Sequence, residues 1–325
     1  MDNLKGKNFR RFGLVTVLAV YILIAVGSIV RSTGAGMGCP DWPRCFGQWI
    51  PPTNIKELPT DYKTRFQVAG KMIADFDAFK TWVEYVNRLV GVLIGFFIFI
   101  TLILSTGYYK TDRPIFYLSL LAFLMVAFEG WLGSKVVATN LSPLLITLHM
   151  VVALLIVLVL IYAVFRSFQA LPIYENIDSK GFINKILWLA LCLSLLQIVL
   201  GTQVREAVDH ISASLNYAFR ETWVEKIGTF FYIHRSFSLL IFGLNLFLAY
   251  QIRKNTLLGS RLRLWGLGLL LMLFVEIASG AMLSYLAMPA FLQPIHLFLA
   301  TLIFGVQFVM LLLINTHAKT SVEKI

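Results

Sequence analysis

The sequence predicts an all-α membrane protein, in which eight transmembrane helices form two tandem four-helix bundles. Of the 325 residues, 58% are hydrophobic and only 14% are charged, too apolar a mixture for a soluble domain with a water-facing shell. The apolar residues also gather in long runs, and polar residues recur within these runs at one constant spacing. Together these observations predict a membrane protein whose second half duplicates the first.

Each predicted helix is an apolar run of about 20 residues, the length that crosses about 30 Å of hydrocarbon. The runs cover residues 12–31, 81–107, 114–135, 143–166, 183–204, 227–252, 262–285 and 291–315. The first run follows a basic start, KGKNFRR, but it is longer than the roughly 7–15 apolar residues of a signal peptide and no small-residue cleavage site follows it. We expect it to remain as a membrane anchor.

The charge distribution predicts the orientation in the membrane. The formal net charge of +11 would suggest a nucleic acid partner in a soluble protein, but here the basic residues sort by loop. If the N-terminus is inside, that face collects most lysines and arginines, whereas two of the opposite loops are short and hold only Lys135 between them. The positive-inside rule then places both termini in the cytoplasm, and we expect no nucleic acid partner.

Three pairs of polar residues are 147 positions apart, and this spacing indicates an internal duplication. The pairs are Arg88 and Arg235, Glu129 and Glu276, and His149 and His296. The first helix of each half aligns as VGSIVRS and LGTQVRE, which pairs Arg31 with Arg205 at a spacing of 174. The 27 additional residues are expected in the first external loop, from residue 32 to about 80.

We therefore expect an N-terminal bundle in residues 1–170 and a C-terminal bundle in residues 171–325. Because each half has an even number of spans, both insert with the same orientation, related by an axis along the membrane normal. Bundles of this kind commonly hold a cofactor between facing helices.

Three histidines within the predicted spans are candidate metal ligands, since ionisable residues in a membrane are costly and tend to be functional. His149, His234 and His296 lie at similar depth, near ~10 Å below the outer surface at about 1.5 Å per residue. His234 and His296, in the second and fourth helices of one bundle, can reach one iron from opposite sides, which predicts bis-histidine heme ligation. Zinc is disfavoured because only two nitrogens converge, and no C-x-x-C-H motif predicts covalent heme attachment.

The first bundle differs at one ligand position, where WVEYVNRLVGVLIG matches FFYIHRSFSLLIFG. Asn87 stands where the second bundle has His234, so a heme there would have one strong protein ligand, His149. Glu84 shares a helix face with Asn87, and we expect its carboxylate to point towards whatever occupies the bundle. The alternative is that Glu84 only pairs with Arg88 one turn later.

The remaining polar residues leave alternatives open. Arg31, Arg88, Arg205 and Arg235 lie near external helix ends, where they could bind heme propionates or extend to the interface. Glu129 and Glu276 are expected to make a repeated structural hydrogen bond between helices. Cys39 and Cys45 predict a disulfide in an oxidising compartment, with a redox role as the alternative. We expect Cys192 to be a small buried hydrophobe and assign no role to His210 or His317.

Across nearly its whole length the chain resembles the heme A synthase family. The resemblance rests on the segments RSTGAGMGCPDWPRC, EYVNR, EGWLGS, LHMVVAL, YIHRSFS and QPIHLF. It implies an eight-span duplicated fold and conversion of heme O into heme A by oxidation of a ring methyl to a formyl group, for assembly of terminal oxidases.

The resemblance also assigns the sites. It implies a permanent heme b on His234 and His296, a substrate heme in the first bundle with His149 as an iron ligand, and Glu84 as the catalytic carboxylate. Asn87 departs from the pattern, since well-known members have histidine there. Two alternatives are a diheme b-type electron-transfer protein and a heme carrier without catalysis.

The expected setting is a bacterial inner membrane, where membrane lipid surrounds the protein. Heme O synthase, terminal oxidase assembly factors and a second copy of the chain are the expected protein partners.

Overall fold

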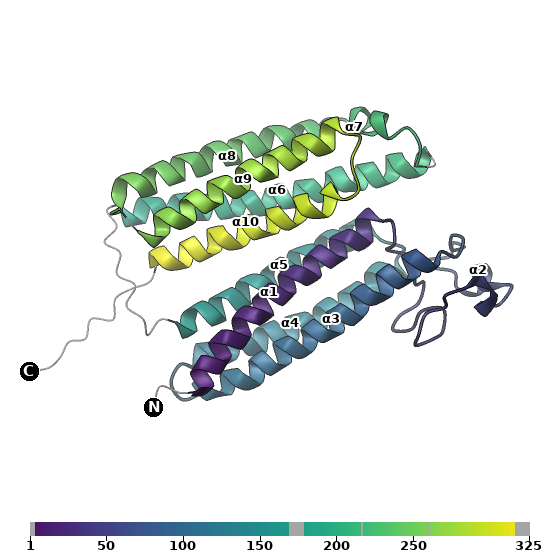
Figure 1. The fold of residues 1–325 in the computed structure, drawn as a ribbon, viewed down its shortest axis with the longest axis horizontal. Helices are drawn as coiled ribbons and strands as arrows, with labels where there is room; N and C mark the ends of the chain where they lie inside the picture. Colours follow the sequence, from purple (N-terminus) through teal and green to yellow (C-terminus); the bar gives the residue numbers. More distant parts are fainter. Residues whose placement is uncertain (1–3, 169–178, 216, 259, 316–325) are drawn as a thin grey trace, which may run out of the picture.

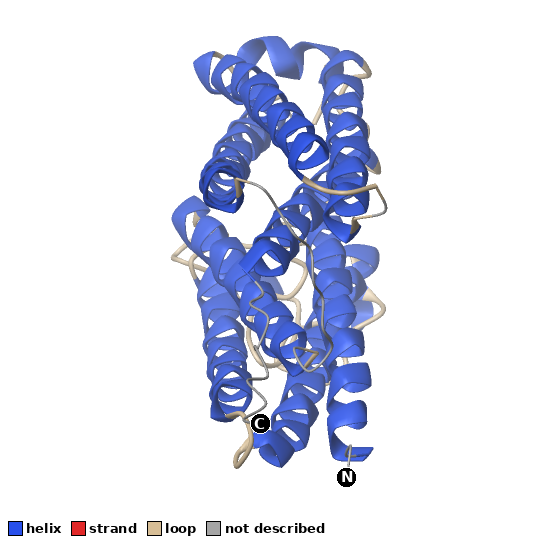
Figure 2. Ribbon diagram, turned by 90° about the vertical axis from the view of Figure 1, so that its left-hand side faces the viewer, coloured by secondary structure: helices blue, strands red, loops and turns tan. Residues whose placement is uncertain are grey.

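The computed structural model describes residues 4–168, 179–215, 217–258 and 260–315, and helices account for most of them. Within these ranges the only β pairing consists of two isolated bridges, between Cys45 and Gln48 and between Val68 and Lys71. Figure 2 accordingly draws the described chain as helix and loop, with one group of helices above the other. The prediction of an all-α fold is confirmed.

Eight long helices form two groups, which Figure 1 shows one above the other. The first group is α1 (Leu4–Ser32), α3 (Ala78–Ser105), α4 (Arg113–Ala138) and α5 (Pro143–Ser167). The second group is α6 (Lys180–Ser214), α8 (Thr229–Asn255), α9 (Arg261–Tyr285) and α10 (Leu292–Asn315).

Local sequence explains where several helices begin. Asp77 is the N-cap of α3 and accepts a hydrogen bond from the backbone nitrogen of Lys80 at 3.1 Å, satisfying an amide that the helix leaves free. Prolines occupy the first turn of α4 and of α5, where the missing N–H costs no helical hydrogen bond.

In each group the helices form a closed ring. The sequence of contacts is α1–α3–α4–α5 and back to α1 in the first bundle, and α6–α8–α9–α10 and back to α6 in the second. The second and fourth helices of each ring, α3 with α5 and α8 with α10, therefore face each other across the bundle. This shared arrangement is consistent with the predicted duplication. The predicted boundary between residues 170 and 171 lies outside the described residues.

The two bundles meet along α1 and α10, where one tyrosine fixes a close approach. Tyr21 lies edge-on to the ring of Phe298, and its hydroxyl donates to the carbonyl of Thr301 at 3.5 Å. A Cβ at Gly305 would lie only 1.9 Å from that hydroxyl oxygen. A side chain at position 305 would therefore force the Tyr21 ring to move, so glycine permits this close contact between the bundles.

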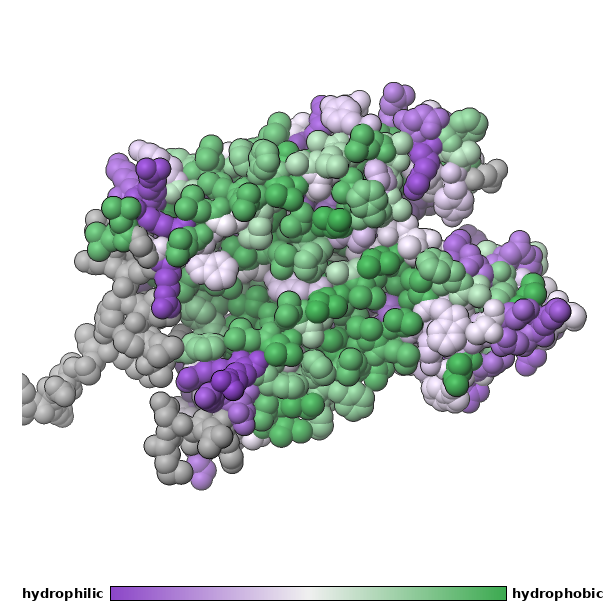
Figure 3. Space-filling model, viewed as in Figure 1, coloured by the Kyte–Doolittle hydropathy of each residue, from purple (hydrophilic) through white to green (hydrophobic). Residues whose placement is uncertain are grey.

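The eight helices are long and apolar enough to cross a membrane, and the protein is a multi-pass membrane protein. Figure 3 shows hydrophobic residues over the middle of the visible face and hydrophilic residues gathered at its two ends. The start of α1 and the end of α10 lie at the same end of the molecule (Figure 1). The observed helices overlap all eight predicted runs.

The loop between α1 and α3, which the sequence predicts to be external, lies at the opposite end of the molecule from the start of α1 (Figure 1) and carries two short helices. They are η1 (Ile55–Glu57) and α2 (Tyr62–Arg65). A small core holds the loop together, in which Phe46 contacts the rings of Tyr62, Phe66 and Phe76. The Asp75 carboxylate, 2.5 Å from the Lys63 ammonium, raises the pKa of that lysine.

Helix α6 extends ten residues beyond its predicted end at position 204, and this is the largest difference from the predicted spans. Its last turns present Val208 to a hydrophobic cluster with Trp223 and Met288 at the loop end of the second bundle. Trp223 begins the short helix α7 (Trp223–Lys226). The extension packs against this cluster but contains the charged residues Arg205, Glu206 and Asp209, so a search for apolar runs ends before it.

Candidate functional site

The two histidines of the second bundle face each other. His234 on α8 and His296 on α10 have ring centroids 6.4 Å apart, with an interplanar angle of 73°. Two imidazoles that bind opposite sides of one metal ion, each through a nitrogen about 2 Å away, have centroids roughly 6 Å apart. Among the described residues, no group of three or more His, Cys, Asp or Glu side chains could hold a metal ion. The donor set therefore fits heme iron, which brings four nitrogens of its own, and not zinc.

The surroundings of His296 determine which ring nitrogen is available. Its Nδ1 lies 2.8 Å from the hydroxyl of Ser279 and 3.1 Å from Oε1 of Glu276, both on α9. This leaves Nε2 as the atom for a metal. A carboxylate beside the other ring nitrogen orients a histidine ligand and raises its basicity.

His149 in the first bundle has the same neighbour. Its Nδ1 lies 3.0 Å from Oε1 of Glu129 on α4. The side chain of His149 is 42% exposed, against 26% for His296, so the first site is the more open. Glu129 and Glu276 thus lie close to the candidate iron ligands on the neighbouring helices, which their spacing in the sequence did not reveal. The repeated structural hydrogen bond expected of them stays a prediction.

Asn87 occupies the position of His234 in the first bundle. Its Oδ1 is buried and has no hydrogen-bond partner among the described residues. Nδ1 of His234 is likewise buried without a partner in this part of the chain. Unsatisfied polar atoms in a membrane protein interior are costly. A group bound in the first bundle would give Oδ1 of Asn87 a partner, whereas Nδ1 of His234 lies on the side of Gly201 on α6.

A glycine on a neighbouring helix lies against each of the four positions. A Cβ would lie 3.3 Å from His234 at Gly201, 3.0 Å from His296 at Gly280, 3.4 Å from His149 at Gly133 and 3.9 Å from Asn87 at Gly27. These glycines are themselves equivalent in the two halves, Gly27 with Gly201 and Gly133 with Gly280. The lack of a side chain there gives the rings space against the neighbouring helix.

Glu84 contacts the external loop and Arg88, and this differs from the expected orientation into the bundle. The residue is 4% exposed, its Oε2 accepts a hydrogen bond from the backbone nitrogen of Cys39 at 2.8 Å, and its Oε1 pairs with Arg88. The contact named as the alternative is therefore present. The catalytic role of Glu84 stays a prediction.

In the second bundle Phe231 stands at the position of Glu84, and the guanidinium of Arg235 lies over its ring, with 5.8 Å to the centroid. A cation–π contact thus replaces the Glu84–Arg88 ion pair.

The segment around the disulfide packs directly on the start of α3. Cys39 and Cys45 form a disulfide, as predicted. Thr81 donates a hydrogen bond to the carbonyl of Gly38 at 2.9 Å, and a Cβ at Gly38 would lie 2.4 Å from the carbonyl oxygen of Lys80. Only glycine permits this approach, which brings Cys39 to Glu84.

Three of the four arginines proposed for propionates have protein partners. Arg88 donates to the carbonyls of Cys39, Asp41 and Arg44 in the loop. Arg31 and Arg205 both pair with Asp209, a residue that the sequence analysis did not single out. Arg235 is exposed, and its only described contacts are with the rings of Phe231 and Tyr232. Propionate binding by these arginines stays a prediction.

The remaining expectations concern Cys192, His210 and His317. Cys192 is exposed on α6, so the prediction of a buried residue is wrong; within a membrane span an apolar thiol can face lipid as well as a core. His210 is exposed, 3.9 Å from Glu206, and has no metal-binding group around it among the described residues. His317 lies outside the described residues.

The fold and site define a class: a multi-pass membrane protein with two four-helix bundles. The second bundle carries histidines on facing helices in a form that suits heme, and the first carries one histidine at the equivalent position. The chain belongs to the family of cytochrome oxidase assembly proteins, whose profile matches residues 10–308.

Curated relatives include proteins named heme A synthase from three bacteria. The protein of Shouchella clausii is 26% identical over 323 residues, covering 96% of this chain and 98% of the relative. That of Exiguobacterium sibiricum is 25% identical and covers 91% of each chain, and that of Pelagibacter ubique is 27% identical over 69% of this chain and 66% of the relative.

Proposed function

We propose that this protein is a heme A synthase, which oxidises a ring methyl of heme O to a formyl group by successive hydroxylations. Family membership and the names of its relatives support the reaction. The single structural observation that carries the proposal is the asymmetry between two otherwise matched sites. His149 and His296 each sit beside a carboxylate and a glycine, but only His296 faces a second histidine.

The second bundle is proposed to hold a permanent heme b. His234 and His296 would be the axial ligands, and a heme held there supplies one-electron transfer. Two fixed imidazoles suit this task because the coordination changes little between oxidation states. Glu276 holds the His296 ring in place through the contact at Nδ1.

The first bundle is proposed to receive heme O as substrate. His149 would bind the substrate iron from one side, with Glu129 orienting its ring. Asn87 offers at most a weak ligand on the other side, which favours release of the product.

Glu84 is proposed to accept the proton released when a C–H bond of the reacting methyl group is broken, and the electrons would leave through the one-electron transfer that a heme in the second bundle supplies. The carboxylate of Glu84 is held at the start of α3 by Arg88 and by the backbone amide of Cys39. A carboxylate is one of the side-chain groups that accept a proton in general base catalysis. Release of this carboxylate from its present partners is part of the proposal.

The orientation and partners also remain proposals. Both termini are proposed to be cytoplasmic, in a bacterial inner membrane, which places the disulfide loop and all three candidate ligating histidines towards the external side. Heme O synthase is the natural source of the substrate, and assembly of a terminal oxidase would consume the product. Self-association is a further proposal.

The test is to express the chain with a source of heme O, extract the hemes and compare wild type with Glu84→Ala. Wild type should yield heme A, and the variant should yield much less while retaining its low-spin heme. Absence of heme A from wild type would contradict the proposed reaction and favour a diheme cytochrome if heme b fills both sites, or a heme carrier if heme O leaves unchanged.

A further inference from the structure

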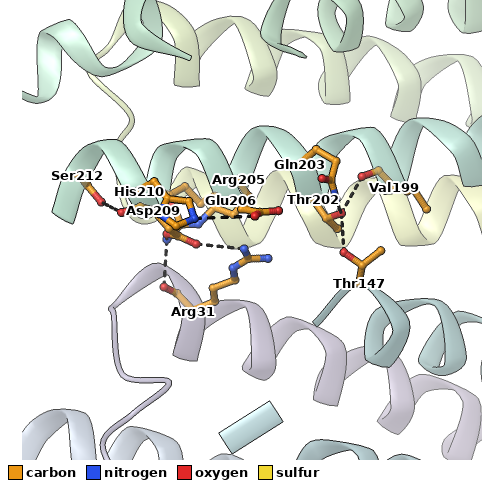
Figure 4. A network of polar contacts seen from close by, with 11 residues as sticks. Arg31, Thr147, Val199, Thr202, Gln203, Arg205, Glu206, Asp209, His210 and Ser212 are labelled. Carbon is orange, nitrogen blue, oxygen red and sulfur yellow. Dashed lines mark hydrogen bonds and ion pairs between the residues drawn. The ribbon is translucent and has the colours of Figure 1, made fainter. Parts of the chain in front are cut away.

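One carboxylate joins the two bundles at the end that carries the external loop. Asp209 on α6 lies 3.1 Å from Nη2 of Arg31 through Oδ2 and 2.7 Å from Nη2 of Arg205 through Oδ1 (Figure 4). Arg31 ends the first helix of the first bundle, and Arg205 is its counterpart in the second. A single carboxylate therefore pairs with the equivalent arginines of both halves and offsets one of their two positive charges.

Asp209 breaks the symmetry of the duplication. Ala35 stands 174 positions earlier, where a counterpart in the first half would be, and it is fully buried. The bridging carboxylate is thus supplied by the second half alone. It belongs to the part of α6 that extends beyond the predicted span.

Arg205 makes two further hydrogen bonds where the bundles meet. Its Nη2 also donates to the backbone carbonyl of Arg31 at 3.2 Å, and its Nη1 donates to Oε1 of Gln293 on α10. A cation at the carboxyl end of α1 is favoured by the helix dipole. Arg205 of the second bundle therefore caps the helix that leads into the external loop of the first.

A second bridge shows that this interface lies between the two candidate sites. The hydroxyls of Thr147 on α5 and Thr202 on α6 are 3.0 Å apart (Figure 4). Thr147 is two residues from His149, and Thr202 follows Gly201, which lies against His234. A shift of α6 against α5 at this level would displace groups next to both sites.

We propose that Asp209 is a positioning residue that couples the two heme sites. A propionate of the substrate that pairs with Arg31 displaces Asp209 from that arginine. Asp209 then pairs more fully with Arg205, and this changes the electrostatic potential at the second site. The inference rests on the proposed function for the identity of the substrate. By linkage the effect is reciprocal: occupation of the first site shifts the potential of the heme in the second, and reduction of that heme changes substrate affinity.

The experiment uses full-length protein purified with its resident heme, and heme O as the probe. The resident heme is followed through its low-spin ferric EPR signal during a redox titration, with and without saturating heme O. In wild type we expect heme O to shift its midpoint potential, because couplings between sites typically change affinity about 5- to 150-fold. A tenfold change corresponds to about 59 mV for a one-electron couple.

Three variants separate coupling from structure. Asp209→Asn keeps the size of the side chain and should lose at least half of the shift, whereas Asp209→Glu should retain most of it. Glu206→Gln removes a negative charge one turn away whose only described contact is His210 at 3.9 Å, and it should leave the shift unchanged.

The proposal is overturned if Asp209→Asn keeps the full shift, or if wild type binds heme O with no shift at all. The shift in midpoint potential requires only that heme O binds, and not that it is converted to heme A. A protein that shows the shift but makes no heme A would contradict the proposed reaction while leaving the coupling intact.

Discussion

The carboxylate of Glu84 accepts a hydrogen bond from the backbone amide of Cys39, with Oε2 and the nitrogen 2.8 Å apart. The candidate catalytic carboxylate of the first bundle is therefore tied to the disulfide-bonded loop that covers it. Arg88 binds both partners, since it pairs with Glu84 and donates to the carbonyl of Cys39 at 2.9 Å. Glu84 can thus act as a proton acceptor, as an anchor for the loop, or as both.

Glu84→Gln separates these two roles. Glutamine can still accept the hydrogen bond from Cys39 but cannot accept a proton. If Glu84 is the proton acceptor, heme A formation falls by roughly 10²- to 10⁴-fold, the usual contribution of a general base. Limited proteolysis of the external loop should remain as in wild type.

The matched comparison is Glu84→Ala, which should lose heme A formation and also expose the loop to protease. Normal heme A formation by the glutamine variant, with loss only in the alanine variant, would show that Glu84 is an anchor and nothing more.

Replacement of Glu276 by glutamine should raise the midpoint potential of the heme in the second bundle. The carboxylate lies 3.1 Å from Nδ1 of His296, where it increases the basicity of the ligand and favours the ferric state. Loss of such a partner typically weakens metal binding about 10- to 100-fold, so heme retention during purification should also fall. Redox titration and heme content measure both effects.

Glu129→Gln is the control, because Glu129 stands beside His149 in the other bundle. It should leave the potential of the second heme where it is in wild type. Equal shifts from both variants would mean that the effect is not transmitted through the His296 ring.

Gly280→Ala should displace the ring of His296. The added Cβ would lie 3.0 Å from Cε1, closer than ordinary contact, and in a close-packed interior such overpacking typically costs about 1–3 kcal/mol. We expect less retained heme and a broadened low-spin EPR signal. Gly268→Ala on the same helix meets no atom within 4 Å and serves as the control; identical heme content in the two variants would contradict the assignment of His296 as a ligand.

The fold could be predicted from sequence because its main determinants are long apolar runs and a repeated spacing. The apolar runs predicted all eight helices. The recurrence of Arg88, Glu129 and His149 at a spacing of 147 positions predicted the arrangement in two bundles. Prediction failed where a helix continues past its apolar run, as in the last turns of α6, where Val208 packs against Trp223. The spacing of Val204, Ala207, Val208 and Ile211 was the available signal for a longer amphipathic helix.

The candidate site was predicted in part. Facing histidines follow from helix order and depth, and the structure brings His234 and His296 together. The side-chain direction of Glu84 did not follow, because its partner Cys39 is 45 positions away in an irregular loop. Asp209 was missed because a charged residue beyond a span looks like ordinary solvated surface until its two arginine partners are placed beside it.

Asn87→His should give the first bundle a second strong ligand. We expect the purified variant to retain more heme than wild type, with an additional low-spin EPR signal, because the imidazole would face His149 as His234 faces His296. The reciprocal variant, His234→Asn, should lose the low-spin signal of the second bundle. An unchanged heme content and spectrum in Asn87→His would mean that this position does not face the substrate iron.

The central claim is that the second bundle retains one heme b while the first exchanges heme O for heme A. The most direct measurement is the amount and type of heme extracted per chain from protein purified with a heme O source. The account predicts one heme b per chain, with heme O and heme A together present at less than one. Two equally retained molecules of heme b per chain would contradict it.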